Sequence, residues 1–344
     1  MHLIHSILLL VKYINCTITY SIMFVFILST IGCKNSTERN SVAGNKDQET
    51  ANLDRPNIVF VISDDQSYPH ASAYGEDWIR TPGFDKIAAE GILFTNAFSA
   101  SPGCSPSRAA ILTGLNTWQL KQAGTHDSEF PLDYKVFPEI LEKIGYKVGF
   151  TGKGWGPGNW GASGRSRNPA GEEYDMAYTK PNLKEVSSID YAENFNQFLL
   201  ERNKDEPFYF WFGSREPHRV YEEGSGIRSG KKIESVSVPA FLPDSPDVRS
   251  DLLDYALEIE YFDQQLLKVI TKLEKVGELE NTLIIVTSDN GMPFPYAKAN
   301  ANEYGTHVPL AIRWGKKLKG GKLVKDLVSL IDIAPTILEA AYGE

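Results

Sequence analysis

The chain has 344 residues, a formal net charge of −9, 42% hydrophobic residues and 11% aromatic residues. This composition is typical of a globular protein of one large or two smaller domains, and it excludes a fibrous or wholly disordered chain. The acidic balance argues against a nucleic-acid-binding protein, because contacts with phosphates need clustered Lys and Arg.

The first 33 residues differ from the rest of the chain. They hold one Lys and no acidic residue, and an apolar core precedes Gly32 and Cys33. This pattern is typical of an export signal, and the small residue before Cys33 resembles the cleavage site of a bacterial lipoprotein, although Thr30 stands where Leu is usual. We therefore expect an exported protein of the bacterial periplasm or cell surface, held at the membrane by a lipid. The alternative is a plain N-terminal membrane anchor, which the apolar stretch from Leu3 supports.

Residues 34–54 are polar, and we expect them to form a flexible tether between the leader and a catalytic domain over residues 55–344. Cys16 and Cys33 lie in the leader, so Cys104 has no partner in the domain for a disulfide or a thiolate metal site. It stands between Pro102 and Pro106, beside a glycine, and this setting predicts a loop rather than core. A small buried cysteine is the common alternative. We interpret Cys104 as a candidate reactive residue.

Four apolar runs predict strands that end in polar residues. The runs cover residues 56–65, 145–156, 207–218 and 281–291. They lack apolar–polar alternation, which is typical of strands buried on both faces in a parallel sheet between helices. Helical patterns occupy much of the chain around these strands. The predicted helices cover residues 81–91, 107–114, 137–145, 249–278 and 332–341. This succession predicts an α/β layered fold.

Two segments are rich in Gly, Ser, Pro and charged residues, namely 156–190 and 219–248. We expect them to form long surface loops around a site. Ligands of such sheets bind beyond the carboxyl ends of the strands, where all four polar clusters are expected to meet.

Two of these clusters offer oxygen ligands. The candidate ligands are Asp64, Asp65, Asp289 and Asn290. Carboxylates with an amide, and without a His or Cys set, favour Ca²⁺, with Mg²⁺ as the alternative, over Zn²⁺. Taken alone, the Asp pair is more typical of a helix cap, and the Asp289 segment of a turn.

Cationic side chains accompany these ligands. They are Arg108, Lys153, His218 and Lys298. Each alone is more often a solvated surface charge, but their shared position predicts a pocket for a tetrahedral anion. Ser107, at the start of a predicted helix, would add backbone N–H groups and the helix dipole.

The segment CSPSRAAILTG, residues 104–114, resembles the signature of the type I sulfatases, which is C-x-P-S-R with L-T-G following the Arg by four residues. The stretches VISDDQ, GKG, PH and SDNG follow in the order of that family, and the similarity runs from Pro56 to Ala341. SDNGMPFPYAKAN and EPHR are similar to the heparan N-sulfatase branch.

The resemblance implies an alkaline-phosphatase-like fold, with a largely parallel sheet sandwiched by helices. It also implies that a maturation enzyme oxidises Cys104 to formylglycine, an aldehyde that is hydrated to a diol. One hydroxyl attacks sulfur, and the other then expels sulfate as the aldehyde reforms. A serine could not complete this cycle, because its sulfate ester has no neighbouring hydroxyl to drive elimination.

Residue roles follow from the same resemblance. The implied metal ligands are Asp64, Asp65, Asp289, Asn290 and the modified Cys104. Arg108 is implied to hold the diol, and Lys153, His218 and Lys298 to contact sulfate or donate a proton.

Two positions bear on how far these roles carry over. The N-sulfatase branch usually has a His two residues after Lys153, where this chain has Trp155, so His218 is our candidate for the general acid. His307 is a second candidate for substrate contact, with a structural turn histidine as the alternative.

The resemblance also carries an expectation about the C-terminal region. Sulfatases typically continue into a smaller antiparallel subdomain, whereas this sequence stops at AAYGE, so we expect that subdomain to be missing and the catalytic domain to be truncated.

The sequence as a whole predicts a Ca²⁺-dependent sulfatase acting on a sulfated glycan. N-sulfoglucosamine of heparan or heparin is the first choice, which would place the protein in glycosaminoglycan degradation. The aromatic residues Trp155, Trp160 and Tyr174 are candidates for stacking on sugar rings, and the alternative is core packing, which is the commoner role of a single aromatic residue. The alternatives are a phosphodiester or phosphonate hydrolase of the same superfamily, and an inactive surface protein that binds glycans.

Overall fold

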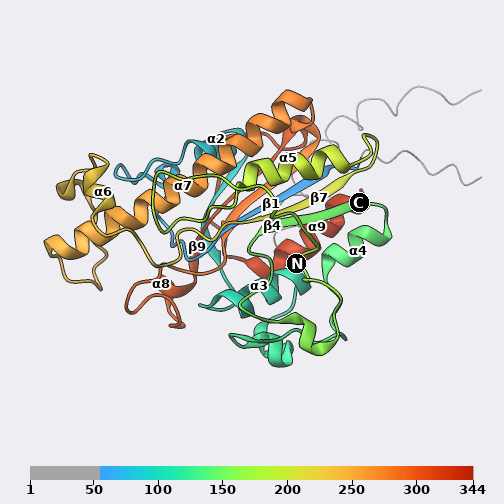
Figure 1. Ribbon diagram of the computed structural model, residues 1–344, viewed down its shortest axis with the longest axis horizontal. Coiled ribbons are helices and arrows are strands. Elements are labelled where there is room, and N and C mark those ends of the chain that lie inside the picture. The colour runs from blue at the N-terminus through green and yellow to red at the C-terminus, as the bar shows by residue number, and fades with distance from the viewer. Residues whose placement is uncertain (1–54, 344) are drawn as a thin grey trace, which may run out of the picture. The chain divides into compact units, whose positions relative to one another are not determined.

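The computed structural model describes residues 55–343 (Figure 1). The expected leader, the polar tether and the cysteines Cys16 and Cys33 lie outside these residues. In the described part, no helix has both the length and the apolar character needed to cross a membrane.

Four parallel strands form the centre of the sheet, and all four were predicted. In spatial order they are β8 (Thr282–Ser288), β1 (Asn57–Ser63), β7 (Phe208–Gly213) and β4 (Lys147–Gly152). Nearly every residue of these strands is buried, as the lack of apolar–polar alternation in their sequences predicted. The expectation of a largely parallel sheet is therefore confirmed at its core.

The sheet continues beyond both sides of this centre. The outer strands are β6 (Glu172–Glu173) beside β4, β9 (His307–Trp314) beside β8, and then β2 (Ile92–Phe98), β10 (Lys322–Val324) and β11 (Val328–Ser329). β9 runs antiparallel to both β8 and β2. The sequence analysis missed both β2 and β9. The polar residues Thr95 and Asn96 interrupt the apolar run of β2, and Pro309 interrupts that of β9. A separate short pair joins β3 (Ser128–Glu129) to β5 (Gly158–Asn159).

The helices form layers on the two faces of the sheet. They are α2 (Pro82–Glu90), α3 (Cys104–Thr113), α4 (Phe137–Lys143), α5 (Tyr191–Glu201), α6 (Ser225–Arg228), α7 (Pro246–Val276), α8 (Glu303–Thr306) and α9 (Ile333–Tyr342). Figure 1 shows α2, α5 and α7 on one face, and α3, α4 and α9 on the other. The five predicted helices are present, and α5 was not predicted.

The first of these layers shows how the core is built. Val59 and Val61 of β1 project to the same face and join a buried cluster with Phe198 of α5 and Phe262 and Leu266 of α7. Each such side chain contributes about 1.5–3 kcal/mol when it is fully buried. Alternate residues of the same strand face the second helix layer, where Phe60 packs edge-on against Trp211. Burial on both faces holds the strand ends in a fixed register.

The two predicted loop segments hold only short regular elements. Residues 156–190 contain β5, β6 and a 3₁₀ turn, and residues 219–248 contain α6, another 3₁₀ turn and the first residues of α7. The 3₁₀ turns of the described chain are Ser72–Tyr74, Thr117–Gln119, Lys121–Gly124, Trp160–Ser163, Ile233–Ser235, Leu279–Asn281, Gly315–Lys317 and Leu330–Asp332.

Candidate active site

The register of the central strands brings their terminal residues to one edge. Ser63 of β1 pairs with Ser288 of β8, so the next residues, Asp64 and Asp289, leave the sheet at the same level. Gly152 ends β4 beside the end of β7, which delivers Lys153 to the same edge. The structure therefore confirms that the ends of these strands, and the polar residues that follow them, meet at one edge of the sheet.

Three buried carboxylates form the centre of this edge. Asp64, Asp65 and Asp289 are each at most 2% exposed, and one oxygen of each lies within 4.8 Å of the others. Asp65 adopts a left-handed conformation with φ of 75°, which costs a non-glycine residue free energy. Its backbone N–H donates to Asp289 Oδ1 over 3.1 Å. Strain of this kind persists where the surrounding structure holds it, and it is concentrated at functional sites.

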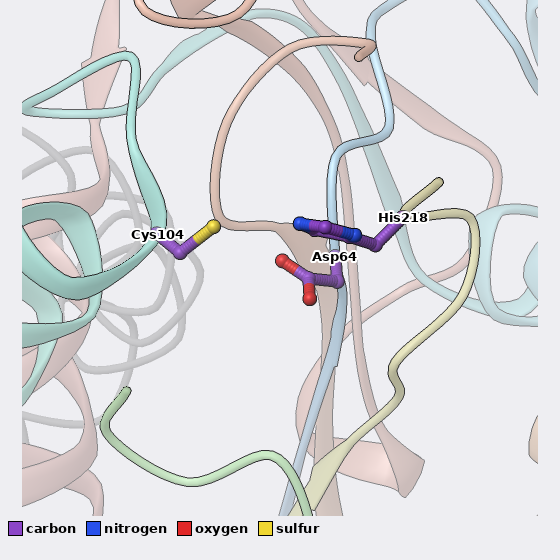
Figure 2. A group of neighbouring side chains, drawn as sticks. All are labelled: Asp64, Cys104 and His218. Atoms are coloured by element: carbon purple, nitrogen blue, oxygen red, sulfur yellow. The ribbon is translucent and has the colours of Figure 1, made fainter. Parts of the chain in front are cut away.

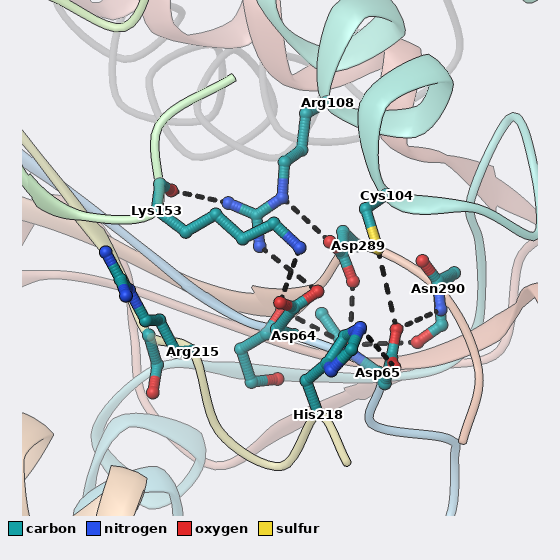
Figure 3. A network of polar contacts seen from close by, with 12 residues as sticks. Asp64, Asp65, Cys104, Arg108, Lys153, Arg215, His218, Asp289 and Asn290 are labelled. Carbon is teal, nitrogen blue, oxygen red and sulfur yellow. Dashed lines mark hydrogen bonds and ion pairs between the residues drawn. The ribbon is translucent and has the colours of Figure 1, made fainter. Parts of the chain in front are cut away.

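Three cations pair with these carboxylates. Figure 3 labels two of them, Arg108 and Lys153. Lys153 Nζ lies 2.5 Å from Asp64 Oδ2, and Lys298 Nζ lies 2.6 Å from Asp65 Oδ2. Wholly buried Arg108 pairs through Nε with Asp289 Oδ2 over 2.7 Å. Three negative and three positive side chains sum to zero, so a bound divalent cation would leave the site positive and favourable for an anion.

The electrostatics keep Asp64 ionised. Burial by itself would raise the pKa of Asp64, but Lys153 and Arg108 outweigh burial and hold this pKa well below its usual range. For Asp289 the balance is reversed, because burial raises the pKa above its usual value in spite of Arg108.

The cluster has oxygen atoms suited to a metal ion. Asp64 Oδ1 and Asn290 Oδ1 are buried without a hydrogen-bond partner in the described part of the chain. Buried acceptors are rarely left unpaired, and a bound ion is one explanation for such an exception. An all-oxygen donor set from Asp64, Asp65, Asp289 and Asn290 fits Ca²⁺ or Mg²⁺. Arg108 Nη2 is likewise without a hydrogen bond and lies 3.8 Å from Asp64 Oδ1. This N–H group is therefore free to donate to a bound anion.

Cys104 lies against this cluster, but not in a loop as predicted. It is the first residue of α3, with extended Gly103 as the N-cap, and it is 1% exposed. The helix begins three residues before the expected start, and Ser107 in its first turn donates to the backbone oxygen of Asp289 over 2.5 Å. Figure 2 shows the Cys104 thiol facing Asp64 and His218.

The thiol is in a setting that suppresses its reactivity. Sγ lies 3.8 Å from Asp65 Oδ1. Burial first, and then the charges of Asp64 and Asp289, raise the pKa of Cys104 well above its usual value. Without a bound cation these surroundings disfavour the thiolate, which is the reactive form of a cysteine.

His218 stands at the open side of the cluster. Its side chain is 43% exposed, and Nε2 lies 3.8 Å from Asp65 Oδ2. Nδ1 lies 2.6 Å from the carbonyl oxygen of Arg219, so Nδ1 carries a proton and donates it to that acceptor. This contact directs Nε2 towards the cluster.

A cavity of about 750 Å³ extends from Asp64, Lys153 and His218. Its volume is in the range of small-molecule binding sites. Sequence reasoning missed several residues that line it, namely His126, Glu185, Arg215, Arg219 and Glu258. Two signals in the sequence point to such residues. Arg215 and Arg219 flank His218 in SREPHR, and Glu258 falls four residues before Phe262, where the apolar period of the helix calls for an apolar residue.

The aromatic residues predicted to contact sugars differ in their surroundings. Trp155 lines the cavity, but it is 2% exposed and its Nε1 donates to Ser105 O over 3.0 Å. Trp160 is half-buried in a 3₁₀ turn. Tyr174 is a core residue that packs against Phe198, so the sugar-stacking expectation for Tyr174 is wrong.

The side chain of His307 is packed against other residues of the fold. Its ring stacks between Tyr68 and Phe98, with centroid distances of 4.1 Å and 4.6 Å. Nε2 lies 2.8 Å from the carbonyl oxygen of Thr95. Its hydrogen-bond and ring contacts, which include one with Glu303, involve no residue of the metal-ligand cluster. This packing corresponds to the structural alternative for His307.

We therefore expect His307→Phe to reduce stability without changing substrate binding. The stacking remains, but the partly buried carbonyl of Thr95 loses its donor, which costs about 1 kcal/mol. Urea denaturation checks the stability, and the KM for a sulfated substrate checks binding. A raised KM with unchanged stability would instead assign His307 to the substrate.

Comparison with known proteins places this geometry in a family. The family model described as Sulfatase matches residues 56–344. The chain belongs to the sulfatase family. N-sulphoglucosamine sulphohydrolase of Homo sapiens is 30% identical to this sulfatase over 316 residues, which cover 82% of this chain and 60% of that protein.

Other relatives show the range of the family. An ulvan-active sulfatase of Formosa agariphila is 26% identical over 95% of this chain and 59% of its own length. The chain thus spans about 60% of the length of these curated relatives. A solved structure described as a complex with its substrate, D-glucosamine-2-N,6-O-disulfate, matches with a TM-score of 0.62 and 23% identity, over 84% of this chain and 77% of that one. This similarity confirms the predicted sulfatase fold.

Proposed function

We propose that this sulfatase hydrolyses the sulfate ester or sulfamate of a sulfated glycan, with N-sulfoglucosamine as the first choice of substrate. The observation that carries the proposal is the convergence of three carboxylates, three cations and Cys104 in one cluster, beside a cavity that Asp64 and Lys153 line. The preference for N-sulfoglucosamine rests on the human relative, which bears that name and is 30% identical.

The proposed metal ligands are the four oxygen-bearing side chains at the ends of β1 and β8. They are Asp64, Asp65, Asp289 and Asn290, and the unpaired oxygens of Asp64 and Asn290 support this assignment. A Ca²⁺ ion, with Mg²⁺ as the alternative, would supply positive charge that polarises the sulfate group.

Cys104 is proposed to act after conversion to formylglycine by a maturation enzyme of the host. The segment CSPSRAAILTG around Cys104 supports this, because it resembles the sulfatase signature and the chain belongs to that family. When formed, the hydrated aldehyde supplies the attacking hydroxyl and a second hydroxyl that releases sulfate.

The remaining residues bind the anion and move a proton. Lys153, Lys298 and Arg108 each pair with one carboxylate of the cluster, and from there they would hold the sulfate oxygens. His218 is proposed as the general acid, because its Nε2 faces the cluster while Nδ1 is fixed on the carbonyl of Arg219. From Nε2 a proton would pass to the leaving nitrogen or oxygen of the sugar.

The location and partners of the protein are proposed from its N-terminal sequence. The apolar leader and Cys33 support export and lipid attachment at a bacterial membrane. A surface or periplasmic location would expose the enzyme to extracellular sulfated glycans.

The proposed function is tested with the full chain produced together with a formylglycine-generating enzyme. We expect hydrolysis of 4-nitrophenyl sulfate and of N-sulfoglucosamine, and much less hydrolysis of 4-nitrophenyl phosphate. Preference for the phosphate, or for a phosphonate ester, would support the superfamily alternative. Glycan binding without turnover, independent of metal and of Cys104 modification, would support the inactive binding protein.

Metal removal gives a separate prediction. Dialysis against a chelator is expected to abolish turnover, because the site loses the positive charge that would polarise the sulfate group. Adding back Ca²⁺ or Mg²⁺ in parallel identifies the active ion. Unchanged turnover at chelator concentrations that remove all bound metal, measured by atomic emission, would contradict the proposed metal site.

A further inference from the structure

Helix α7 buries three carboxyl side chains, and two of them have clear structural partners. Asp254 accepts hydrogen bonds from three groups at the start of α6. Asp263 accepts from two backbone N–H groups at the start of α2. These two carboxylates therefore join neighbouring helices to α7. The third carboxyl group, that of Glu258, makes no such link between α7 and another helix.

Glu258 is 4% exposed and makes no hydrogen bond or ion pair with the described residues. Its side chain lines the cavity that also reaches Asp64, Lys153 and His218. The fully enclosed side-chain atoms without a partner do not include the oxygens of Glu258, so its carboxyl group is open to the cavity. An apolar residue would suit this face of the helix better. A ligand in the cavity would provide the missing partner.

The charges around Glu258 determine which ligand it suits. Burial first, and then Glu216 and Glu185, raise the pKa of Glu258 to about 9, with a smaller contribution from Asp254. Arg219 acts in the opposite direction. At neutral pH the carboxyl group is protonated, so it can both donate and accept a hydrogen bond, as a sugar hydroxyl does.

We propose that Glu258 is a substrate-binding residue that hydrogen-bonds a hydroxyl of the sugar ring carrying the sulfate. This inference rests on the proposed function and extends it to recognition of the sugar. The cavity volume of about 750 Å³ leaves room for a pyranose ring beside the sulfate group. A buried polar group that needs the hydroxyl discriminates against substrates that lack it.

The test compares Glu258→Leu and Glu258→Gln on two substrates, N-sulfoglucosamine and 4-nitrophenyl sulfate. Glu258→Leu is expected to raise the KM for the sugar about tenfold or more, with kcat within about threefold of wild type, because the lost contact contributes to binding. Glu258→Gln keeps a donor and an acceptor, so its KM should stay within about threefold of wild type. For the aryl sulfate, which has no sugar hydroxyl, kcat/KM should be unchanged in both variants.

Gln265→Leu is the matched control. Gln265 is also on α7, is 2% exposed and has an unpartnered Oε1, but it does not line the cavity. The KM of the Gln265→Leu variant for the sugar should equal that of wild type. The melting temperature adds a readout of folding. Glu258→Leu should melt at or above the wild-type temperature, because it removes an unpaired buried carboxyl.

Calorimetric titration of glucosamine into the Cys104→Ala variant, with and without Glu258→Leu, gives a readout without turnover. We expect the second substitution to weaken glucosamine binding about tenfold. Equal binding in both backgrounds, or no binding in either, overturns the inference, as does an equal kinetic effect on the two substrates. Failure of wild type to hydrolyse either sulfate would refute the proposed function instead, and the titration would still decide the role of Glu258.

Discussion

Replacement of Cys104 by Ala is expected to abolish sulfate hydrolysis, with a loss of at least about a thousandfold in kcat, because it removes the side chain from which the nucleophile is made. The fold should tolerate the change. Cys104 begins a helix, its side chain makes one weak contact at 3.8 Å, and Ala is a strong helix former. Steady-state turnover of 4-nitrophenyl sulfate and the far-UV spectrum are the two measurements.

The Cys104→Ser variant separates the two halves of the reaction. A serine hydroxyl can be sulfated, but its ester has no second hydroxyl to expel sulfate, so the variant should trap a covalent sulfate. Mass spectrometry of the peptide covering residues 101–108 should show a gain of about 80 Da on the serine after incubation with substrate. In the wild-type protein the same peptide should be about 18 Da lighter than its thiol form. Full turnover by a protein whose Cys104 remains a thiol would refute the formylglycine assignment.

Arg108→Met is the second substitution with a large expected effect, and here the effect is on folding as well as activity. Arg108 is wholly buried, and it pairs with Asp289 over 2.7 Å and lies 3.8 Å from Asp64. Removing one partner of a buried ion pair leaves an uncompensated charge and typically costs about 3–5 kcal/mol. Urea unfolding without metal should show this loss, and saturating Ca²⁺ should restore part of it by supplying positive charge.

A surface pair provides the control for this prediction. Lys121 pairs with Asp133 at a site where both side chains are more than half exposed. Lys121→Met should unfold at nearly the wild-type urea concentration, because water already screens that pair. An Arg108→Met protein as stable as the Lys121→Met control would show that the buried cluster tolerates unpaired carboxylates, which would contradict the electrostatic account of the site.

The central sheet was predictable because its strands are buried on both faces. The runs that became β1, β7 and β8 have continuous apolar centres, the shorter run of β4 lacks apolar–polar alternation, and each run is followed by polar residues. That pattern establishes strands, a layered fold and a common edge for the polar ends without any coordinates. The type and position of the proposed metal ligands followed in the same way, since carboxylates and an amide after such strands favour a hard cation.

Pairing between segments far apart in the chain determined the features that the local sequence pattern did not predict. β2 and β9 have weak local signals, and they become strands because each completes the hydrogen bonds of its neighbour in the sheet. The helix start at Cys104 was missed because its prolines suggested a loop, whereas a proline is tolerated in the first turn of a helix. His307 was ambiguous for a similar reason, since its stacking partner Tyr68 is distant in the sequence.

The sequence by itself determined the family resemblance, the strand order along the chain and the residue types that meet at the sheet edge, because these depend on local composition and spacing. Only the tertiary structure decided which polar atoms are buried without a partner, among them Asp64 Oδ1 and Asn290 Oδ1, and that Glu258 lines the cavity. Burial and hydrogen bonding depend on every neighbour in space, and those neighbours come from segments far apart in the chain.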